Sequence, residues 1–320
     1  MKTTRTISPL VMSWLLIAVS GLFVLPVTAE QLDRPDLIQI FHVGHGPKFL
    51  AFDGFNIWVT TSGDDTVTKL LATDGSPQGT FGTGGRYPQF ITFDGPNIWV
   101  SNLETDSVGK LQASDGTLLG TFQVGNGPEG IAWDGANIWV SSFYGNSVKK
   151  LRGSDGAVLG TFPVGLTPWG VLSEGDNIWV ANAGSNTVSK LRASDGALLQ
   201  TAPVGGYPVN LVFDGVKMWV LNNFDGSVTA FNAGSGVVQG TVRIGTRPWG
   251  ITFDGANIWA TNSDDDTASI LRARNGAVTG VHPVGDRPFG VVFDGNSIWM
   301  ANNLDNTVVK ITRTAPSDTQ

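Results

Sequence analysis

The sequence predicts an all-β fold, a seven-bladed β-propeller with four antiparallel strands in each blade. Three observations support this prediction. A pattern of about 40 residues recurs seven times, short strand-like runs within it are separated by Gly, Asn and Asp turns, and one copy is divided between the two ends of the chain. A period of this length is typical of solenoids, propellers and arrays. Four short strands per repeat favour the propeller.

Tryptophan and proline mark the period. The first two anchor tryptophans are 41 residues apart and all later ones are 40 apart. They are Trp58, Trp99, Trp139, Trp179, Trp219, Trp259 and Trp299. The anchor prolines keep the same spacing, at Pro47, Pro88, Pro128, Pro168, Pro208, Pro248 and Pro288. We therefore treat the repeat as one structural unit that is used seven times.

Each repeat is expected to form four strands, and the copy at residues 128–165 shows them most clearly. Its four runs of strand-forming residues are 130–133, 138–140, 148–151 and 159–164. An Asp-Gly turn at Asp134 follows the first run, and a second one at Asp155 precedes the last. Runs of this length between such turns predict antiparallel hairpins. No repeat contains an apolar pattern long enough for a capped helix.

The ends of the chain predict how the ring closes. The seventh copy stops after three runs, at residues 289–293, 297–301 and 307–311. The missing fourth run lies at the other end, because residues 39–44 match residues 160–165 position by position. We expect this leading strand to complete the last blade, which would remove the open sheet edges.

The first 29 residues have the pattern of a secretory signal peptide. Lys2 and Arg5 precede an apolar run, and the small residues 27–29 form a cleavage site. An uncleaved anchor is the alternative, but the apolar run is short for a membrane span and ends at Pro26. The predicted organisation is a signal peptide at 1–29, a linker at 30–36, the propeller at 37–313 and a C-terminal tail at 314–320. We expect an extracytoplasmic monomer, periplasmic or secreted, without stable membrane insertion after cleavage.

Composition excludes several kinds of chemistry. The chain has no cysteine, so it has no thiol nucleophile and no thiolate metal site. Its 20 basic and 27 acidic residues give a net charge of −7, and no Lys/Arg cluster is present. Nucleic acid is therefore not an expected partner. No nucleophile-elbow serine, phosphate-binding loop or dinucleotide fingerprint occurs.

One face of the predicted propeller varies from blade to blade. It carries the links between blades, which end at the anchor prolines, and the loops after the second strands; we call it the link face. The opposite face carries the Asp-Gly turns, which are nearly identical. We interpret these aspartates as turn formers, because Asp bonds its own backbone and Gly takes positive φ. A specific site is expected on the variable face.

Aromatic and amide side chains concentrate on the link face. The predicted ligand-binding residues are Trp169, Trp249, Phe289, Tyr87, Tyr207, Asn182, Asn222, Asn262 and Asn302. Aromatic faces beside amides suit a glycan, a peptide or a protein ligand. The alternatives are that the aromatic rings pack between blades and that the amides bond the loop backbone. No catalytic residue is predicted.

The repeat also carries a resemblance. The run Phe-Asp-Gly-Ala-Asn-Ile-Trp, followed by Asn-Thr-Val-Ser-Lys-Leu, resembles the YVTN and NHL groups of propeller repeats and the repeats of the streptogramin lyase family. That family uses histidines and glutamates around a magnesium ion to open a lactone by elimination. This chain has three histidines, His42, His45 and His282, and only His45 is expected on the link face. The family's site therefore does not carry over.

A second implication concerns a metal ion. Calcium-dependent lactonase propellers place a Glu, an Asn and an Asp around a central ion, and Glu129 and Asn210 begin first strands in a comparable way. The resemblance thus implies a hypothetical Ca²⁺ or Mg²⁺ site in the central channel, and no other cofactor is expected. The predicted function is a binding module that acts through the link face. The alternative is a metal-dependent lyase or lactonase centred on Glu129, Asn210 and His45.

Overall fold

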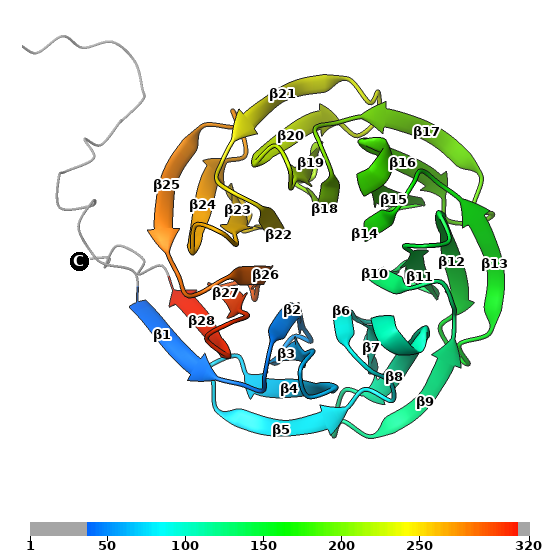
Figure 1. Ribbon diagram of the computed structural model, residues 1–320, viewed down its shortest axis with the longest axis vertical. Coiled ribbons are helices and arrows are strands. Elements are labelled where there is room, and N and C mark those ends of the chain that lie inside the picture. The colour runs from blue at the N-terminus through cyan, green and yellow to red at the C-terminus, as the bar shows by residue number, and fades with distance from the viewer. Residues whose placement is uncertain (1–36, 313–320) are drawn as a thin grey trace, which may run out of the picture. The chain divides into compact units, whose positions relative to one another are not determined.

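The computed structural model describes residues 37–312, which form seven four-stranded antiparallel sheets arranged in a ring (Figure 1). The seven-bladed, all-β prediction is confirmed. The predicted signal peptide, linker and tail lie outside the described residues, as does residue 313. Among the described residues, no helix is both long and apolar enough to cross a membrane.

The strands follow the repeat closely. Blades one and two contain β2 (Pro47–Phe52), β3 (Asn56–Thr61), β4 (Thr66–Leu71), β5 (Pro77–Gly82), β6 (Pro88–Phe93), β7 (Asn97–Asn102), β8 (Ser107–Gln112) and β9 (Leu118–Gln123). Blades three and four contain β10 (Pro128–Trp133), β11 (Asn137–Ser142), β12 (Ser147–Arg152), β13 (Val158–Pro163), β14 (Pro168–Glu174), β15 (Asn177–Asn182), β16 (Thr187–Arg192) and β17 (Leu198–Pro203). Blades five and six contain β18 (Pro208–Phe213), β19 (Lys217–Asn222), β20 (Ser227–Asn232), β21 (Val238–Arg243), β22 (Pro248–Phe253), β23 (Asn257–Asn262), β24 (Thr267–Arg272) and β25 (Val278–Pro283).

Blade seven is built from both ends of the described chain. It contains β26 (Pro288–Phe293), β27 (Ser297–Asn302), β28 (Thr307–Thr312) and β1 (Leu37–His42), and β1 pairs with β28 in antiparallel register. Phe41 of β1 stacks on Trp299 at 5.5 Å between ring centroids, as Phe81 packs on Trp58 at 5.7 Å in blade one. The predicted closure is confirmed, and Figure 1 shows the blue and red strands side by side.

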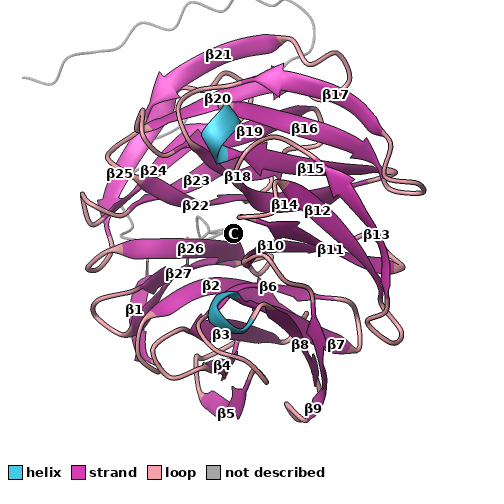
Figure 2. Cartoon of the chain, turned by 45° about the vertical axis from the view of Figure 1, so that its right-hand side comes forward, coloured by secondary structure: helices cyan, strands magenta, loops and turns pink. Residues whose placement is uncertain are grey.

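Helical structure is almost absent from the described residues. Two short 3₁₀ turns, η2 (Leu103–Thr105) and η3 (Ala183–Ser185), follow the second strands of blades two and four (Figure 2). Both end on a residue in the left-handed region, Asp106 at φ 52° and Asn186 at φ 55°. They therefore belong to the link-face loops and leave the sheets regular.

The anchor tryptophans form the core between blades, and all seven are buried. In blade three, Asp134 accepts hydrogen bonds from the backbone N–H of Ala136 at 2.9 Å and from the indole N–H of Trp139 at 2.7 Å. The turn interpretation of the aspartates is thus confirmed, and the carboxylate of Asp134, in the turn before the second strand, also accepts from a buried indole. The same pair recurs as Asp53–Trp58, Asp94–Trp99, Asp214–Trp219, Asp254–Trp259 and Asp294–Trp299.

Lysines on the third strands connect neighbouring blades. Lys110 lies 4.9 Å from its own blade's Trp99 ring and donates to the Gly153 and Ser154 carbonyls of the next blade at 2.8 and 3.2 Å. Lys69, Lys150, Lys190 and Lys310 make equivalent contacts. These bonds hold the blades in register around the ring.

Candidate functional site

The side chains that follow the anchor prolines lie at the link-face end of the innermost strands. We call them the mouth ring: Lys48, Gln89, Glu129, Trp169, Val209, Trp249 and Phe289. The first strands of neighbouring blades contact one another around the whole circle. Every first strand has a register shift directly after its anchor proline. A β-bulge redirects side chains, so it turns this position away from the regular pleat.

Hydroxyl groups on the second strands hold the bulges in place. In blade one, Thr60 Oγ1 accepts the Phe49 N–H at 3.0 Å and donates to the Gln89 carbonyl of blade two at 2.8 Å. Ser141 donates to the Trp169 carbonyl at 2.6 Å, and Thr261 donates to the Phe289 carbonyl at 2.5 Å. The backbone beneath these ring members is therefore fixed by the preceding blade.

In blade five an amide side chain replaces the hydroxyl group that fixes the first-strand backbone of the next blade. Leu221 occupies the hydroxyl position, and Asn210 Nδ2 donates to the Trp249 carbonyl at 3.3 Å instead. Asn210 Oδ1 accepts the Leu211 N–H at 2.9 Å. Both polar atoms of Asn210 are thus engaged with backbone, which gives this residue a positioning role beneath Trp249.

One half of the mouth ring is aromatic. The Trp169 and Trp249 ring centroids lie 5.1 Å apart, and Trp249 stacks on Phe289 at 5.3 Å. Phe143, from the loop after β11, meets Trp169 edge-on at 5.6 Å. Both tryptophans are half-buried, and Trp169 Nε1 has no hydrogen-bond partner among the described residues. This half can contact the apolar face of a ligand.

The other half of the ring is polar, and it contains a buried carboxyl. Glu129 is 3% exposed, and its Oε2 atom has no hydrogen-bond partner within residues 37–312. Burial raises the pKa of Glu129 to about 8, and the positive charge of Lys48 acts in the opposite direction. Gln89, also buried, lies between these two in the order of the blades. A buried polar atom without a hydrogen-bond partner is uncommon, so the Glu129 carboxyl is a candidate for interaction with a ligand.

Lys48 has an unusual environment at the seam between blades seven and one. Its ammonium lies 4.2 Å from the Phe289 ring centroid and 5.5 Å from that of Tyr87. Burial lowers the pKa of Lys48 to about 8; Glu129 opposes this shift and Arg287 adds to it. The other seven lysines in the described part of the chain each donate to a backbone carbonyl, whereas Lys48 has no such acceptor there.

The structure separates the predicted ligand-binding residues into two groups. Trp169, Trp249, Phe289 and Tyr87 come together at the mouth ring, where the aromatic rings also pack on one another between blades. The amides Asn182, Asn222, Asn262 and Asn302 are instead buried within their blades, at 0 or 1% exposure.

The buried amides bond their own blades. Asn182 Nδ2, for example, donates to the Thr187 and Ser189 hydroxyls at 3.1 and 2.9 Å, and its Oδ1 accepts the Gly165 N–H at 3.1 Å. These positions match the structural alternative and place the amides out of reach of a ligand on the link face. The last residue of the second strand points into the blade, which the sequence pattern did not show.

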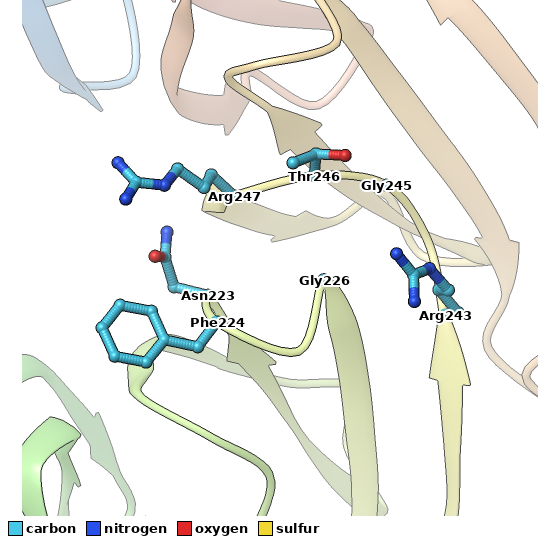
Figure 3. A pocket seen from close by; sticks show the side chains of 7 residues that line it. All are labelled: Asn223, Phe224, Gly226, Arg243, Gly245, Thr246 and Arg247. Carbon is cyan, nitrogen blue, oxygen red and sulfur yellow. The ribbon is translucent and has the colours of Figure 1, made fainter.

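Tyr207 belongs to a separate part of the link face. It stacks on Phe224 at 4.3 Å, and Phe224 is 68% exposed. Beside them lies a cavity of about 230 Å³ between blades five and six. Its lining residues are Asn223, Phe224, Gly226, Arg243, Gly245, Thr246 and Arg247 (Figure 3). None of these belongs to the mouth ring, and Arg247 is ion-paired with Asp264 at 3.6 Å.

The residues present do not fit the magnesium cage of the streptogramin lyases. No group of three or more His, Cys, Asp or Glu side chains converges within residues 37–312. His45 is exposed and bonds Asp64 at 2.8 Å. Asn210 bonds the backbone through both of its polar atoms, and the hypothetical Ca²⁺ or Mg²⁺ site at Glu129 and Asn210 stays a prediction.

Several known structures share the fold of this chain. No family model and no curated protein sequence matches the chain. A streptogramin B lyase structure has a TM-score of 0.76 at 19% identity, covering 87% of this chain and 97% of that one. A catalytically inactive histidine-to-alanine variant of virginiamycin B lyase from Staphylococcus aureus with quinupristin has a TM-score of 0.77 at 18% identity, covering 87% and 100%. The hydrazine synthase of Kuenenia stuttgartiensis has a TM-score of 0.73 at 19% identity, covering 86% and 99%. The resemblance to streptogramin lyase propellers is confirmed at the level of the fold.

Lys48 is the residue that the site prediction missed. It was one of seven variable positions after the anchor prolines, and it is the only basic residue among them. The positive charge of Lys48 was the feature of the sequence that could have identified it as a site residue. Its importance depends on the Phe289 ring from the other end of the chain, which the repeat pattern alone could not place beside it.

Proposed function

We propose that this chain is an exported binding module that takes an amphipathic peptide at the mouth ring. The observation that carries the proposal is the division of the ring into two halves. Trp169, Trp249 and Phe289 form the aromatic half, while Lys48 and Glu129 form a polar half in which neither charged group has a hydrogen-bond partner among the described residues. Apolar walls with a few convergent polar groups are typical of ligand sites.

A peptide fits this arrangement better than a glycan does. A peptide backbone offers carbonyl acceptors for the Lys48 ammonium and N–H donors for the Glu129 carboxyl. The tryptophans are half-buried and tilted by 57° to each other, so the exposed parts of their rings offer an apolar surface to a side chain of the peptide. A sugar usually stacks on a flatter and more exposed ring.

The residue before the anchor proline has a left-handed backbone in every blade. Tyr87 and Arg287 precede their anchor prolines in the left-handed region, at φ 57° and 56°. Blades one and three have Gly46 and Gly127 at this position, where glycine adopts the conformation without steric cost. Thr167, Tyr207 and Arg247 adopt the same conformation at φ 46°, 56° and 50°, so it belongs to the shared geometry of the links between blades.

Peptide and glycan arrays probed with the purified protein test this proposal, followed by calorimetry on the best peptide. We expect Trp169→Ala and Glu129→Gln each to weaken binding by roughly tenfold or more. Phe224→Ala, an exposed aromatic on the same face but outside the ring, is the matched control and should bind normally. Retention of glycans alone, or unchanged peptide affinity in the two ring variants, would refute the proposal.

A second candidate is a lyase that works without the metal cage. The fold comparisons and one site observation favour it, because the pKa values of both Glu129 and Lys48 lie near 8 and both groups can exchange protons at neutral pH. Quinupristin incubated with the protein should then elute as a ring-opened product of unchanged mass. Product formation that persists in the double variant Lys48→Met, Glu129→Gln would exclude this site as its source.

A further inference from the structure

Blade five departs from the repeat at the last residue of the loop between its second and third strands. In the other six blades this residue is an Asn or Asp, and its Oδ1 atom accepts the N–H of the residue before the next anchor proline at 2.7 to 2.9 Å. The six residues are Asp65, Asp106, Asn146, Asn186, Asp266 and Asn306. Blade five has Gly226 here, so it has no side chain to make this bond.

The missing side chain coincides with the cavity between blades five and six. Arg247 is the residue before the next anchor proline, and its backbone N–H has no acceptor among residues 37–312. Gly226 and Arg247 both line the cavity of about 230 Å³ (Figure 3). The Gly245 carbonyl oxygen occupies the position that a Cβ of Gly226 would take, so this link can lie so close only beside a glycine. The cavity thus offers an N–H donor where the other blades supply a side-chain oxygen.

Two guanidinium groups give the cavity a positive lining. Arg243 ends β21, and no other outer strand in the described part of the chain ends in Lys or Arg. Its guanidinium has no carboxylate within 4.0 Å among the described residues. Arg247 contacts Asp264 through Nε at 3.6 Å, and both side chains are about half exposed, so this pair is weak. Both arginines can therefore bind an anion that enters the cavity.

The neighbouring acidic side chains are engaged elsewhere. Asp225 accepts the Gly206 N–H at 2.5 Å, and Asp265 accepts the Thr246 N–H at 2.6 Å. No carboxylate is among the residues that line the cavity. The charges that face it are therefore those of the two arginines.

We propose that this cavity binds the carboxylate of a small organic acid. One carboxylate oxygen accepts the Arg247 N–H, as Asp266 Oδ1 accepts the Arg287 N–H at 2.9 Å in the next link. The guanidinium groups of Arg243 and Arg247 supply the opposite charge. A carboxylate suits this place because Asp residues fill it in three other blades. The site lies outside the mouth ring, and the proposal does not depend on peptide binding there.

The shape of the cavity limits the rest of the ligand. Its volume is below the roughly 300–1,000 Å³ that is usual for drug-sized ligands, so the acid is small. Phe224 lines the cavity and is 68% exposed, with Tyr207 stacked on it at 4.3 Å. This ring offers an apolar surface to the carbon skeleton of the acid.

Ligand-observed NMR on the purified protein tests the proposal with benzoate and its neutral isostere benzamide. The amide has the same ring and also offers a carbonyl oxygen, so a preference for benzoate reports the effect of charge. We expect benzoate to bind at least about fivefold more tightly than benzamide, with a smaller difference at high salt. Equal affinities, or tighter binding of inorganic phosphate than of benzoate, would overturn the carboxylate assignment.

Three variants test the position of the site. Gly226→Asn introduces the residue that blades three, four and seven have at this place, and it should abolish benzoate binding by filling the cavity. Arg243→Gln leaves the backbone unchanged and should weaken binding by roughly fivefold. Arg86→Gln is the matched control, because Arg86 is an ion-paired arginine in another link, outside the cavity, and its loss should not change the affinity.

Near-UV circular dichroism shows whether Gly226→Asn keeps the native packing. If it does not, Arg243→Gln compared with Arg86→Gln decides the outcome. Unchanged benzoate affinity in a folded Gly226→Asn variant or in Arg243→Gln would overturn the proposal, as would equal losses in Arg243→Gln and Arg86→Gln.

Discussion

The Trp139 indole donates to Asp134 at 2.7 Å, and this bond joins the turn that precedes β11 to the core between the blades. The next blade lacks it. Its turn carries Glu174, which pairs with Asn177 across the hairpin, and Trp179 Nε1 is buried with no acceptor among the described residues. Six of the seven anchor tryptophans thus donate to a turn aspartate, whereas Trp179 lacks this hydrogen bond and keeps the Lys190 ammonium 4.8 Å from its ring centroid.

This difference predicts unequal costs for equivalent substitutions. Asp134→Ala should lower the free energy of unfolding by roughly 2–4 kcal/mol, because it leaves a buried indole N–H and two turn amides without their acceptor. Glu174→Ala in blade four should cost less than about 1 kcal/mol, since no indole depends on it. Urea unfolding of the two variants makes the comparison. Equal losses would show that the carboxylate–indole bond contributes little.

The lysines that connect neighbouring blades lead to a prediction about stability in blade five, where a second substitution should offset the effect of the first. Ala230 occupies the register where five other blades have lysine and blade six has Ile270, and Lys217 from the neighbouring strand donates to the Ala273 carbonyl at 2.8 Å instead. Lys217→Met should therefore destabilise the protein by roughly 1.5–3 kcal/mol. Adding Ala230→Lys should recover part of this loss. A double variant less stable than the single one would show that the two lysine positions are not interchangeable.

Closure of the ring predicts a strong asymmetry between terminal truncations. Deleting residues 37–44 removes β1, exposes the edge of β28 and uncovers Trp299, so the melting temperature should fall by roughly 10 °C or more. Deleting Ala315–Gln320 should change it by no more than about 2 °C. Calorimetry on the mature forms compares the two. Similar melting temperatures would contradict a structural role for the β1–β28 pair.

The raised pKa of Glu129 predicts how stability depends on pH. A carboxyl whose pKa is higher in the folded state stabilises the fold fully below its unfolded pKa, near 4.3. It loses that contribution as pH rises through the folded value of about 8. Relative to the wild type, Glu129→Gln should thus gain roughly 2–4 kcal/mol between pH 5 and pH 8. Glu104→Gln, at an exposed and ion-paired glutamate, is the control and should show no such trend.

Much of the fold was predictable because each blade repeats the same local signals. The Asp134 turn and the following β-branched and aromatic run need only nearby sequence to interpret, and the match between residues 39–44 and 160–165 needs only comparison with another repeat. The partners of the aspartates were harder to predict. The bond from Asp134 to Trp139 depends on how the turn folds back over the second strand, which a pattern of turn residues does not describe.

The site was predictable only in part, because its contacts cross between blades. Trp169 and Trp249 were correctly placed on one face, yet their contact joins blades four and six and depends on the small Val209 between them. Asn182 looked like a surface amide because it ends a strand, but the strand turns it inward. Whether a side chain such as Glu129 finds a partner is decided by the whole ring and cannot be inferred from one repeat.

The pairing of β1 with β28 also sets an order of events during synthesis. The first strand of the described chain to leave the ribosome must wait for the last before it gains its partner. Contacts this distant in sequence form slowly, because the intervening chain must first be brought together. Six blades can fold as they emerge, while the seventh remains an open template for another chain until translation ends. β1 is only 6 residues long, and this short length limits the edge that could pair wrongly in the interval.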